Sequence, residues 1–166
     1  KEIDGQTAAI EIARHELYGC TGAEMVQEMK PYHIDFPNVK NNCLRFEVSP
    51  SIEESATFTD ADWAELGNDF MQRMGLANHQ YIIIRHSGTE SKKEQAHLHI
   101  LANRVSLSGE LYRDNWIGKK ATEAANAIAK ERNFVQSQDI GKVNVADIKA
   151  AMETVLKKMQ GFAFTK

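Results

Sequence analysis

Three of the six histidines are spaced as ligands of one metal ion would be. His97 and His99 flank a single leucine at the start of an apolar run, and His86 ends the preceding apolar run. If both runs are β-strands, side chains two residues apart project from one face, with Cβ atoms roughly 6.5–7 Å apart, and both rings can reach a common cation. Three neutral imidazoles leave coordination positions open for oxygen ligands, as a metal that polarises a phosphodiester requires. We therefore predict a metal site at His86, His97 and His99.

A structural role for these histidines is the competing interpretation, because a His-apolar-His spacing also recurs by chance. The polar loop between the two runs adds Glu90 and Glu94, which could assist catalysis or could simply be solvated. The other three histidines have no partner at ligand spacing. We place His15 in a predicted helix, and His33 and His79 in predicted loops.

The apolar periodicity predicts the elements that would position these side chains. Strands are predicted at 42–49, 81–84 and 96–105, with a turn at 106–109 and a hairpin partner at 110–112. Helices are predicted at 6–18, 21–30, 59–75, 117–132 and 144–159. Because a hairpin joins some strands and helices join others, we expect an α+β fold with a mainly antiparallel central β-sheet flanked by α-helices.

Composition favours one compact domain over residues 1–166. The chain is 42% hydrophobic, and its three prolines and ten glycines form no linker. The two cysteines are too few for a disulfide framework, no apolar run is long enough to span a membrane, and the first residues lack a signal-peptide pattern. We therefore expect a cytoplasmic protein without membrane insertion.

The charge is unevenly distributed. The formal net charge is −3, which argues against a protein held on nucleic acid by bulk electrostatics. Residues 1–60 carry 5 Lys/Arg against 11 Asp/Glu, whereas the remaining residues carry 15 against 12. A polyanion should therefore bind the second part of the chain.

The two apolar runs also resemble a known motif. They read Tyr81-Ile-Ile-Ile-Arg-His86, then an acidic-polar loop, then His97-Leu-His99-Ile-Leu-Ala-Asn-Arg-Val105. This order is similar to the third motif of mobilisation relaxases of the Mob/VirD2 class. A strand that ends in Ser-Pro, a Thr-Asp-x-x-Trp helix that ends in Met-Gly, and the turn Glu-Arg-Asn-Phe134 are similar too. The resemblance covers roughly residues 8 to 160.

The resemblance implies an endonuclease of the HUH superfamily. In such an enzyme the three histidines hold Mg²⁺ or Mn²⁺, and a tyrosine attacks the scissile phosphate of single-stranded transfer-origin DNA to form a 5′-phosphotyrosyl link. The implied role is to initiate conjugative mobilisation of a plasmid or mobile element in the bacterial cytoplasm. Accessory mobilisation proteins and a coupling protein are the implied partners.

The chain departs from the family pattern in two ways. The family has an acidic residue two places after the first histidine, where this chain has Gly88, so Glu90 or Glu94 would substitute for it. The family's nucleophilic tyrosine lies near the N-terminus, at the end of a first strand that this sequence does not predict. Tyr18 is the only early tyrosine and therefore a candidate. The alternative is that the nucleophile precedes Lys1 and that the domain lacks its extreme N-terminal strand.

DNA contact is expected from polar and basic residues that flank the metal site in the sequence. The candidates are Lys92, Lys93, Asn103, Arg104, Arg113, Lys119 and Lys120. Basic side chains at such positions neutralise backbone phosphates, although each could equally be a solvated surface charge. Two other functions stay open: a His-ligated metallohydrolase that acts on small molecules, and a non-catalytic DNA- or protein-binding domain with structural histidines.

Overall fold

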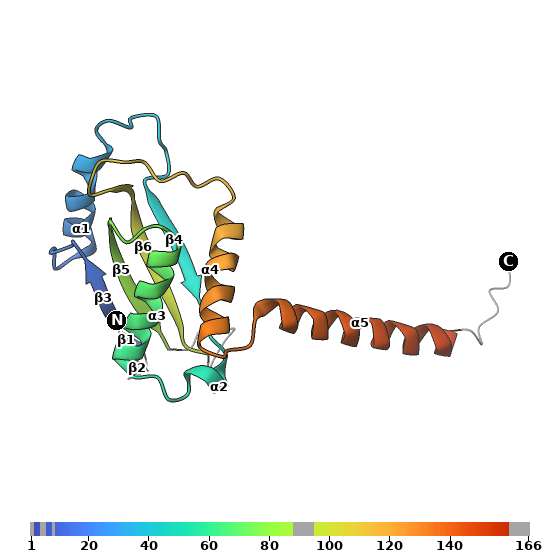
Figure 1. Cartoon of the computed structure of the whole chain (residues 1–166). Helices are drawn as coiled ribbons and strands as arrows, with labels where there is room; N and C mark the ends of the chain where they lie inside the picture. The colour runs from blue at the N-terminus through green and yellow to red at the C-terminus, as the bar shows by residue number, and fades with distance from the viewer. Residues whose placement is uncertain (1, 4–5, 8, 88–94, 160–166) are drawn as a thin grey trace.

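The computed structural model describes residues 2–3, 6–7, 9–87 and 95–159, and its centre is a four-stranded antiparallel sheet of order β3-β5-β6-β4 (Figure 1). The strands are β1 (Glu2–Ile3), β2 (Gln6–Thr7), β3 (Ala9–His15), β4 (Cys43–Val48), β5 (His79–His86) and β6 (His97–Ser106). The helices are α1 (Gly22–Met29), the 3-10 helix η1 (Lys30–His33), α2 (Ile52–Ser55), α3 (Asp60–Arg73), α4 (Ile117–Glu131) and α5 (Ser137–Met159). The predicted α+β class with an antiparallel sheet is confirmed.

One face of the sheet packs against α3 and α4 (Figure 1). The alternation along β4 buries Leu44, Phe46 and Val48, and α3 meets them with the apolar stripe that includes Phe70. The rings of Phe46 and Phe70 lie edge to face with centroids 5.4 Å apart. This layer forms the main hydrophobic core and holds the middle strands from behind.

A smaller cluster lies on the other face, at the end of the sheet where β3 finishes. Leu17 and Met25 pack there against Ile82, and Ile84 and Leu101 border them. Helix α1 begins with a capping box, in which the Thr21 and Glu24 side chains each bond the other's backbone N–H. Helix α1 therefore anchors this end of the sheet, whereas α5 points away from the rest of the molecule (Figure 1).

A tight contact brings α3 close to the two middle strands. The missing side chain of Gly67 lets the helix approach the sheet, because a Cβ at this position would lie 2.7 Å from Ile83 Cδ1 and 3.3 Å from Leu98 Cδ1. Ile83 and Leu98 are both fully buried. Helix α3 therefore rests directly behind the strand segments that carry the histidines.

The prediction of a helix over 6–18 is wrong. Residues 9–15 form β3, an edge strand paired with β5, and His15 therefore lies in a strand. The register of β3 shifts between Glu11 and Ala13, which breaks the two-residue alternation and leaves apolar residues at helix-like intervals. His79, predicted in a loop, begins β5, and His33 lies in η1.

Two other boundaries differ from prediction. The expected hairpin partner at 110–112 makes only an isolated bridge between Leu111 and Val105. Helix α5 starts at Ser137, seven residues before the predicted start at Asn144. In the part of the chain that the structure describes, no helix has the length and apolar character needed to cross a membrane.

Candidate metal centre

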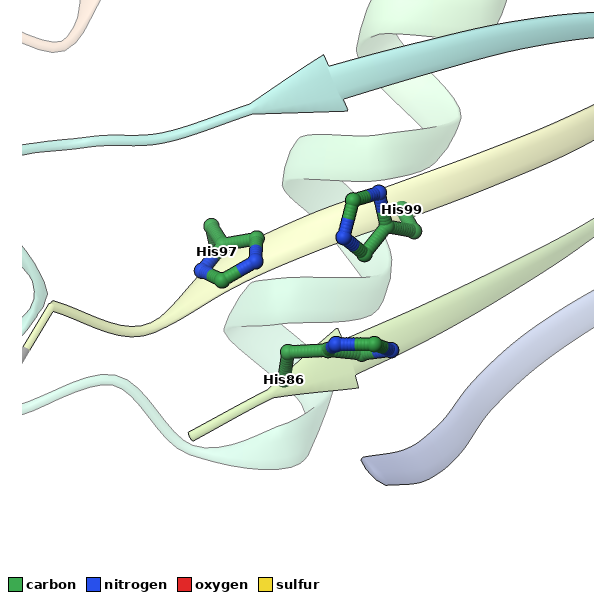
Figure 2. Close-up of side chains that lie close together, drawn as sticks. All are labelled: His86, His97 and His99. Carbon is green, nitrogen blue, oxygen red and sulfur yellow. The ribbon is translucent and has the colours of Figure 1, made fainter. Parts of the chain in front are cut away.

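The three predicted ligands, His86, His97 and His99, meet at one end of the sheet and are called the triad below. His86 is the last residue of β5 and pairs directly with His97, the first residue of β6, while His99 follows two places along the same strand (Figure 2). Each ring offers a nitrogen, and the three nitrogens lie within 4.8 Å of one another. The ring centroids of His86 and His99 are 4.4 Å apart, and those of His97 and His99 are 4.9 Å apart. The structure thus brings the three predicted ligands together.

Strand geometry explains the convergence. Directly opposed residues of antiparallel strands point to the same face, and so do residues two apart on one strand. Leu98, between two of the histidines, therefore points to the α3 side, where it is fully buried. The core anchors this end of β6 from one face and leaves the imidazoles on the other.

The triad rings have different hydrogen-bond partners. The His97 ring is almost fully buried, and its Nδ1 lies 3.2 Å from the carbonyl oxygen of Gln95. A carbonyl can only accept, so this contact places the proton on Nδ1 and leaves the Nε2 lone pair for a cation. Nδ1 of His99 instead lies 3.4 Å from Nη2 of Arg45 on β4.

Two triad rings are held in the neutral form that ligation requires. Burial is the largest cause that lowers the pKa of His86 and of His99 below the ordinary value of 6.5. Electrostatic interactions with His97 and with the positive charge of Arg45 lower both pKa values further, while Glu47 acts in the opposite direction. Both rings are therefore unprotonated near neutral pH and can donate lone pairs to a metal.

Three nitrogen donors on a rigid sheet suit a catalytic more than a structural metal. A closed structural site normally takes four protein ligands, whereas three leave room for water or substrate oxygen. Among the residues that the structure describes, no other group of three or more His, Cys, Asp or Glu side chains is placed to hold an ion. The arrangement could therefore bind a divalent cation and present it to an anionic substrate.

Several predicted site residues lie elsewhere or cannot be placed. Glu90, Glu94, Lys92 and Lys93 fall outside the described residues. Tyr18 follows β3 at the end of the sheet away from the triad, because Ala9 pairs with His86 at one end of that strand and His15 pairs with Tyr81 at the other. The six residue-to-residue steps from Ala9 to His15 span roughly 20 Å. The structure does not bring Tyr18 to the triad.

Asn103 has the environment of a structural residue. Its side chain is fully buried, and its amide donates to Gln80 Oε1 at 2.9 Å and, more weakly, to the Met29 carbonyl at 3.4 Å. Its Oδ1 accepts from the Val105 backbone at 3.1 Å. The Asn103 side chain is therefore inaccessible to DNA in this conformation.

Arg104 is also committed to internal partners. Its Nη2 donates to Asp114 Oδ1 at 2.7 Å, and its Nε and Nη1 donate to the carbonyls of Tyr112 and Asn41 at 3.2 and 3.3 Å. The guanidinium thus ties the segment after β6 to the loop before β4. This position is at the end of β6 away from His97.

The remaining basic candidates share that end of the sheet. Lys120 at the start of α4 donates to the Arg113 carbonyl at 3.0 Å and lies 5.0 Å from the ring centroid of Tyr112. Lys119 is exposed and lies 3.9 Å from Glu123. The structure thus groups Arg113, Lys119 and Lys120 with each other and apart from the triad.

Two residues beside the triad were missed by sequence reasoning. Glu47 on β4 pairs directly with His99, and Arg45 contacts the same ring. The alternation of β4 leaves both on its exposed face. Their proximity to His99 depends on the register between β4 and β6, which the sequence pattern does not specify.

A comparison with protein families supports the same interpretation. Residues 3–134 match the family model described as "Relaxase: MobA/VirD2-like, nuclease domain". The match runs from the first strands to the end of α4 and includes the whole triad. No curated protein and no solved structure matches the chain. The chain belongs to the MobA/VirD2-like relaxase family and carries its nuclease domain.

Proposed function

We propose that this chain is the metal-dependent core of an enzyme that nicks one strand of transfer-origin DNA and thereby starts conjugative mobilisation of a plasmid or another mobile element. The observation that carries the proposal is the triad, which combines three convergent imidazoles with membership of a nuclease family. We extend it to an HUH-type reaction on single-stranded DNA in the bacterial cytoplasm, with accessory mobilisation proteins and a coupling protein as partners.

The chain's residues would hold the cation and keep it rigid. Nε2 of His97 is available because its Nδ1 faces a carbonyl, and the lowered pKa values of His86 and His99 keep their rings neutral. Such a cation offsets charge on the phosphoryl oxygens of a phosphodiester. Imidazole suits Mn²⁺ better than Mg²⁺, which prefers oxygen ligands, so we propose Mn²⁺ as the more effective metal.

The proposed reaction needs a tyrosine hydroxyl, and the four tyrosines all lie toward the far end of the sheet. Tyr81 is buried near the start of β5, and Tyr112 follows β6. Tyr32 lies in η1, and Tyr18 follows β3. The Tyr18 hydroxyl donates to Glu16 at 3.0 Å, and this bond raises its pKa, which disfavours the nucleophilic phenolate.

We therefore propose that the nucleophile comes from a segment before residue 1. The first residue of β3, Ala9, pairs with His86, so a chain that enters β3 arrives beside the triad. This geometry supports an upstream nucleophile over Tyr18.

The test is a nicking assay with the protein extended by its native upstream residues. The substrates are labelled single-stranded oligonucleotides that tile the DNA flanking its gene, with Mn²⁺ present. We expect one oligonucleotide to yield a shortened product and a covalent protein–DNA adduct, and we expect neither from the double variant His97→Ala/His99→Ala. The matched control is His33→Ala, which changes a histidine outside the triad and should retain activity.

The outcomes separate the proposal from its alternatives. Cleavage that survives loss of both triad histidines would exclude the proposed mechanism. Mn²⁺ binding without any DNA cleavage or DNA affinity would favour a small-molecule metallohydrolase. Failure to bind any divalent cation in calorimetry would favour a non-catalytic domain with structural histidines.

A further inference from the structure

Arg45 lies on the same face of the sheet as the triad and next to it. Its cross-strand partner on β6 is Leu101, two residues after His99. Its guanidinium turns toward the metal site, where Nη2 lies 3.4 Å from His99 Nδ1. Arg45 therefore places a permanent positive charge beside the proposed metal.

The contact with His99 conflicts with metal binding. An arginine only donates, so Nδ1 of His99 must supply a lone pair to this hydrogen bond. A neutral imidazole has one lone-pair nitrogen and one N–H, and Nε2 then carries the proton. His99 can therefore give its lone pair to Arg45 or to a cation, but not to both. This holds whichever nitrogen serves as the ligand.

Three other arginines have different partners. Arg14, Arg85 and Arg104 each pair with a carboxylate at 2.5 to 2.7 Å, whereas no carboxylate among the described residues lies within 4.0 Å of Arg45. The 3.4 Å contact with His99 is long for a hydrogen bond and is readily given up. A guanidinium released at this position presents a planar fork of N–H donors, which matches the oxygens of a phosphate.

We infer that Arg45 binds the phosphodiester at the triad, and that His99 holds Arg45 only while the metal is absent. The inference rests on the proposed function, because it assumes a metal and a DNA phosphate at this site. Metal ligation by His99 would break the contact and free the guanidinium. Metal binding would therefore also prepare the site for its anionic substrate.

The first test measures Mn²⁺ affinity by calorimetry for wild type and for Arg45→Gln. We expect the variant to bind Mn²⁺ about three- to tenfold more tightly, because it removes both a competitor for the His99 lone pair and a repelling charge. The matched control is Arg14→Gln. Arg14 lies in the same cross-strand row as Arg45 but at the opposite edge, where Glu11 neutralises it, so its loss should leave the affinity unchanged.

The second test measures binding of a labelled ten-residue thymidine oligonucleotide with and without saturating Mn²⁺. With Mn²⁺, Arg45→Gln should weaken binding about tenfold and reduce the slope of log affinity against log salt by roughly 0.7. Arg45→Lys keeps the charge but not the fork, so it should keep the slope and lose part of the affinity. Without Mn²⁺, Arg45→Gln should change little.

Opposite effects on metal and DNA are the signature of the inferred role. Unchanged or weaker Mn²⁺ binding by Arg45→Gln would overturn it, and so would an equal loss of DNA affinity with and without metal. Both results presuppose that wild type binds Mn²⁺. If wild type does not bind Mn²⁺, the proposed function itself fails. Failure of the proposed function is thereby distinguished from failure of the role inferred for Arg45.

Discussion

Replacing Gly67 with alanine should destabilise the protein, although alanine is the better helix former. Gly67 lies within α3 and faces the sheet. An added Cβ would lie 2.7 Å from Cδ1 and 3.1 Å from Cγ2 of Ile83, and 3.3 Å from Leu98 Cδ1. The nearest atom ends a flexible side chain, but Ile83 and Leu98 are fully buried and have little room to turn. The helix must therefore move away from the sheet.

The magnitude follows from two opposing effects. Alanine gains about 1 kcal/mol over glycine in a helix interior. Forcing a methyl group into a packed core costs about 1–3 kcal/mol. Because two strands contact the new atom, we expect a strain cost in the upper part of this range, about 2–3 kcal/mol, and a net fall of about 1–2 kcal/mol in the free energy of unfolding. Since Leu98 lies between His97 and His99, we also expect weaker Mn²⁺ binding.

Urea unfolding followed by circular dichroism provides the measurement, with calorimetry for the metal. The control is Gly118→Ala in the first turn of α4, where an added Cβ would meet nothing within 4 Å. This variant should be unchanged or more stable by up to about 1 kcal/mol, with normal Mn²⁺ affinity. If Gly67→Ala is as stable as Gly118→Ala, the close approach of α3 to the sheet is not as described, and the reasoning fails.

Three further predictions concern pH, the buried amide and the early tyrosine. The lowered pKa values of His86 and His99 mean that the unfolded chain binds more protons below about pH 6.5, so the free energy of unfolding of the metal-free protein should decrease as pH falls through that window. Replacing both with asparagine should reduce that dependence in urea titrations from pH 8 to 5, and the part that remains should include His79, because burial lowers its pKa too. Asn103→Ala should lower the free energy of unfolding by about 2–3 kcal/mol, by thermal or urea unfolding, because it leaves buried partners unsatisfied. Tyr18→Phe should leave nicking and adduct formation unchanged in the oligonucleotide assay.

The core of the site could be predicted because it depends on local geometry. Alternation along one strand places His97 and His99 on the same face whatever the rest of the fold does. The addition of His86 required only that two neighbouring apolar runs pair as antiparallel strands. The family resemblance pointed to the same three residues, and both routes agree with the observed convergence.

The rest of the site depends on contacts between distant segments, which periodicity does not reveal. Arg45 and Glu47 precede His99 by about fifty residues, and only the β4–β6 register brings them together. The pattern over residues 6–18 predicts a helix because the irregularity near Ile12 disguises the alternation of β3. The basic residues near the end of β6 are close to the triad in sequence, but a ten-residue strand separates them from it in space.

At the end of the sheet away from the triad, buried hydrogen bonds give Asn103 a structural role in the motif that begins with His97. Register in a sheet matters because a slip of one residue moves every side chain to the opposite face, and here it would turn His86 toward α3. Gln80 lies where the pairing of β5 with β6 shifts register. Its side-chain amide donates to the Glu16 carbonyl, and its side-chain oxygen accepts from the Asn103 amide. The His79 ring bonds the Asn103 carbonyl at 2.9 Å. These bonds fix β5 against β6 at one end, so that His86 and His97 stay opposed at the other.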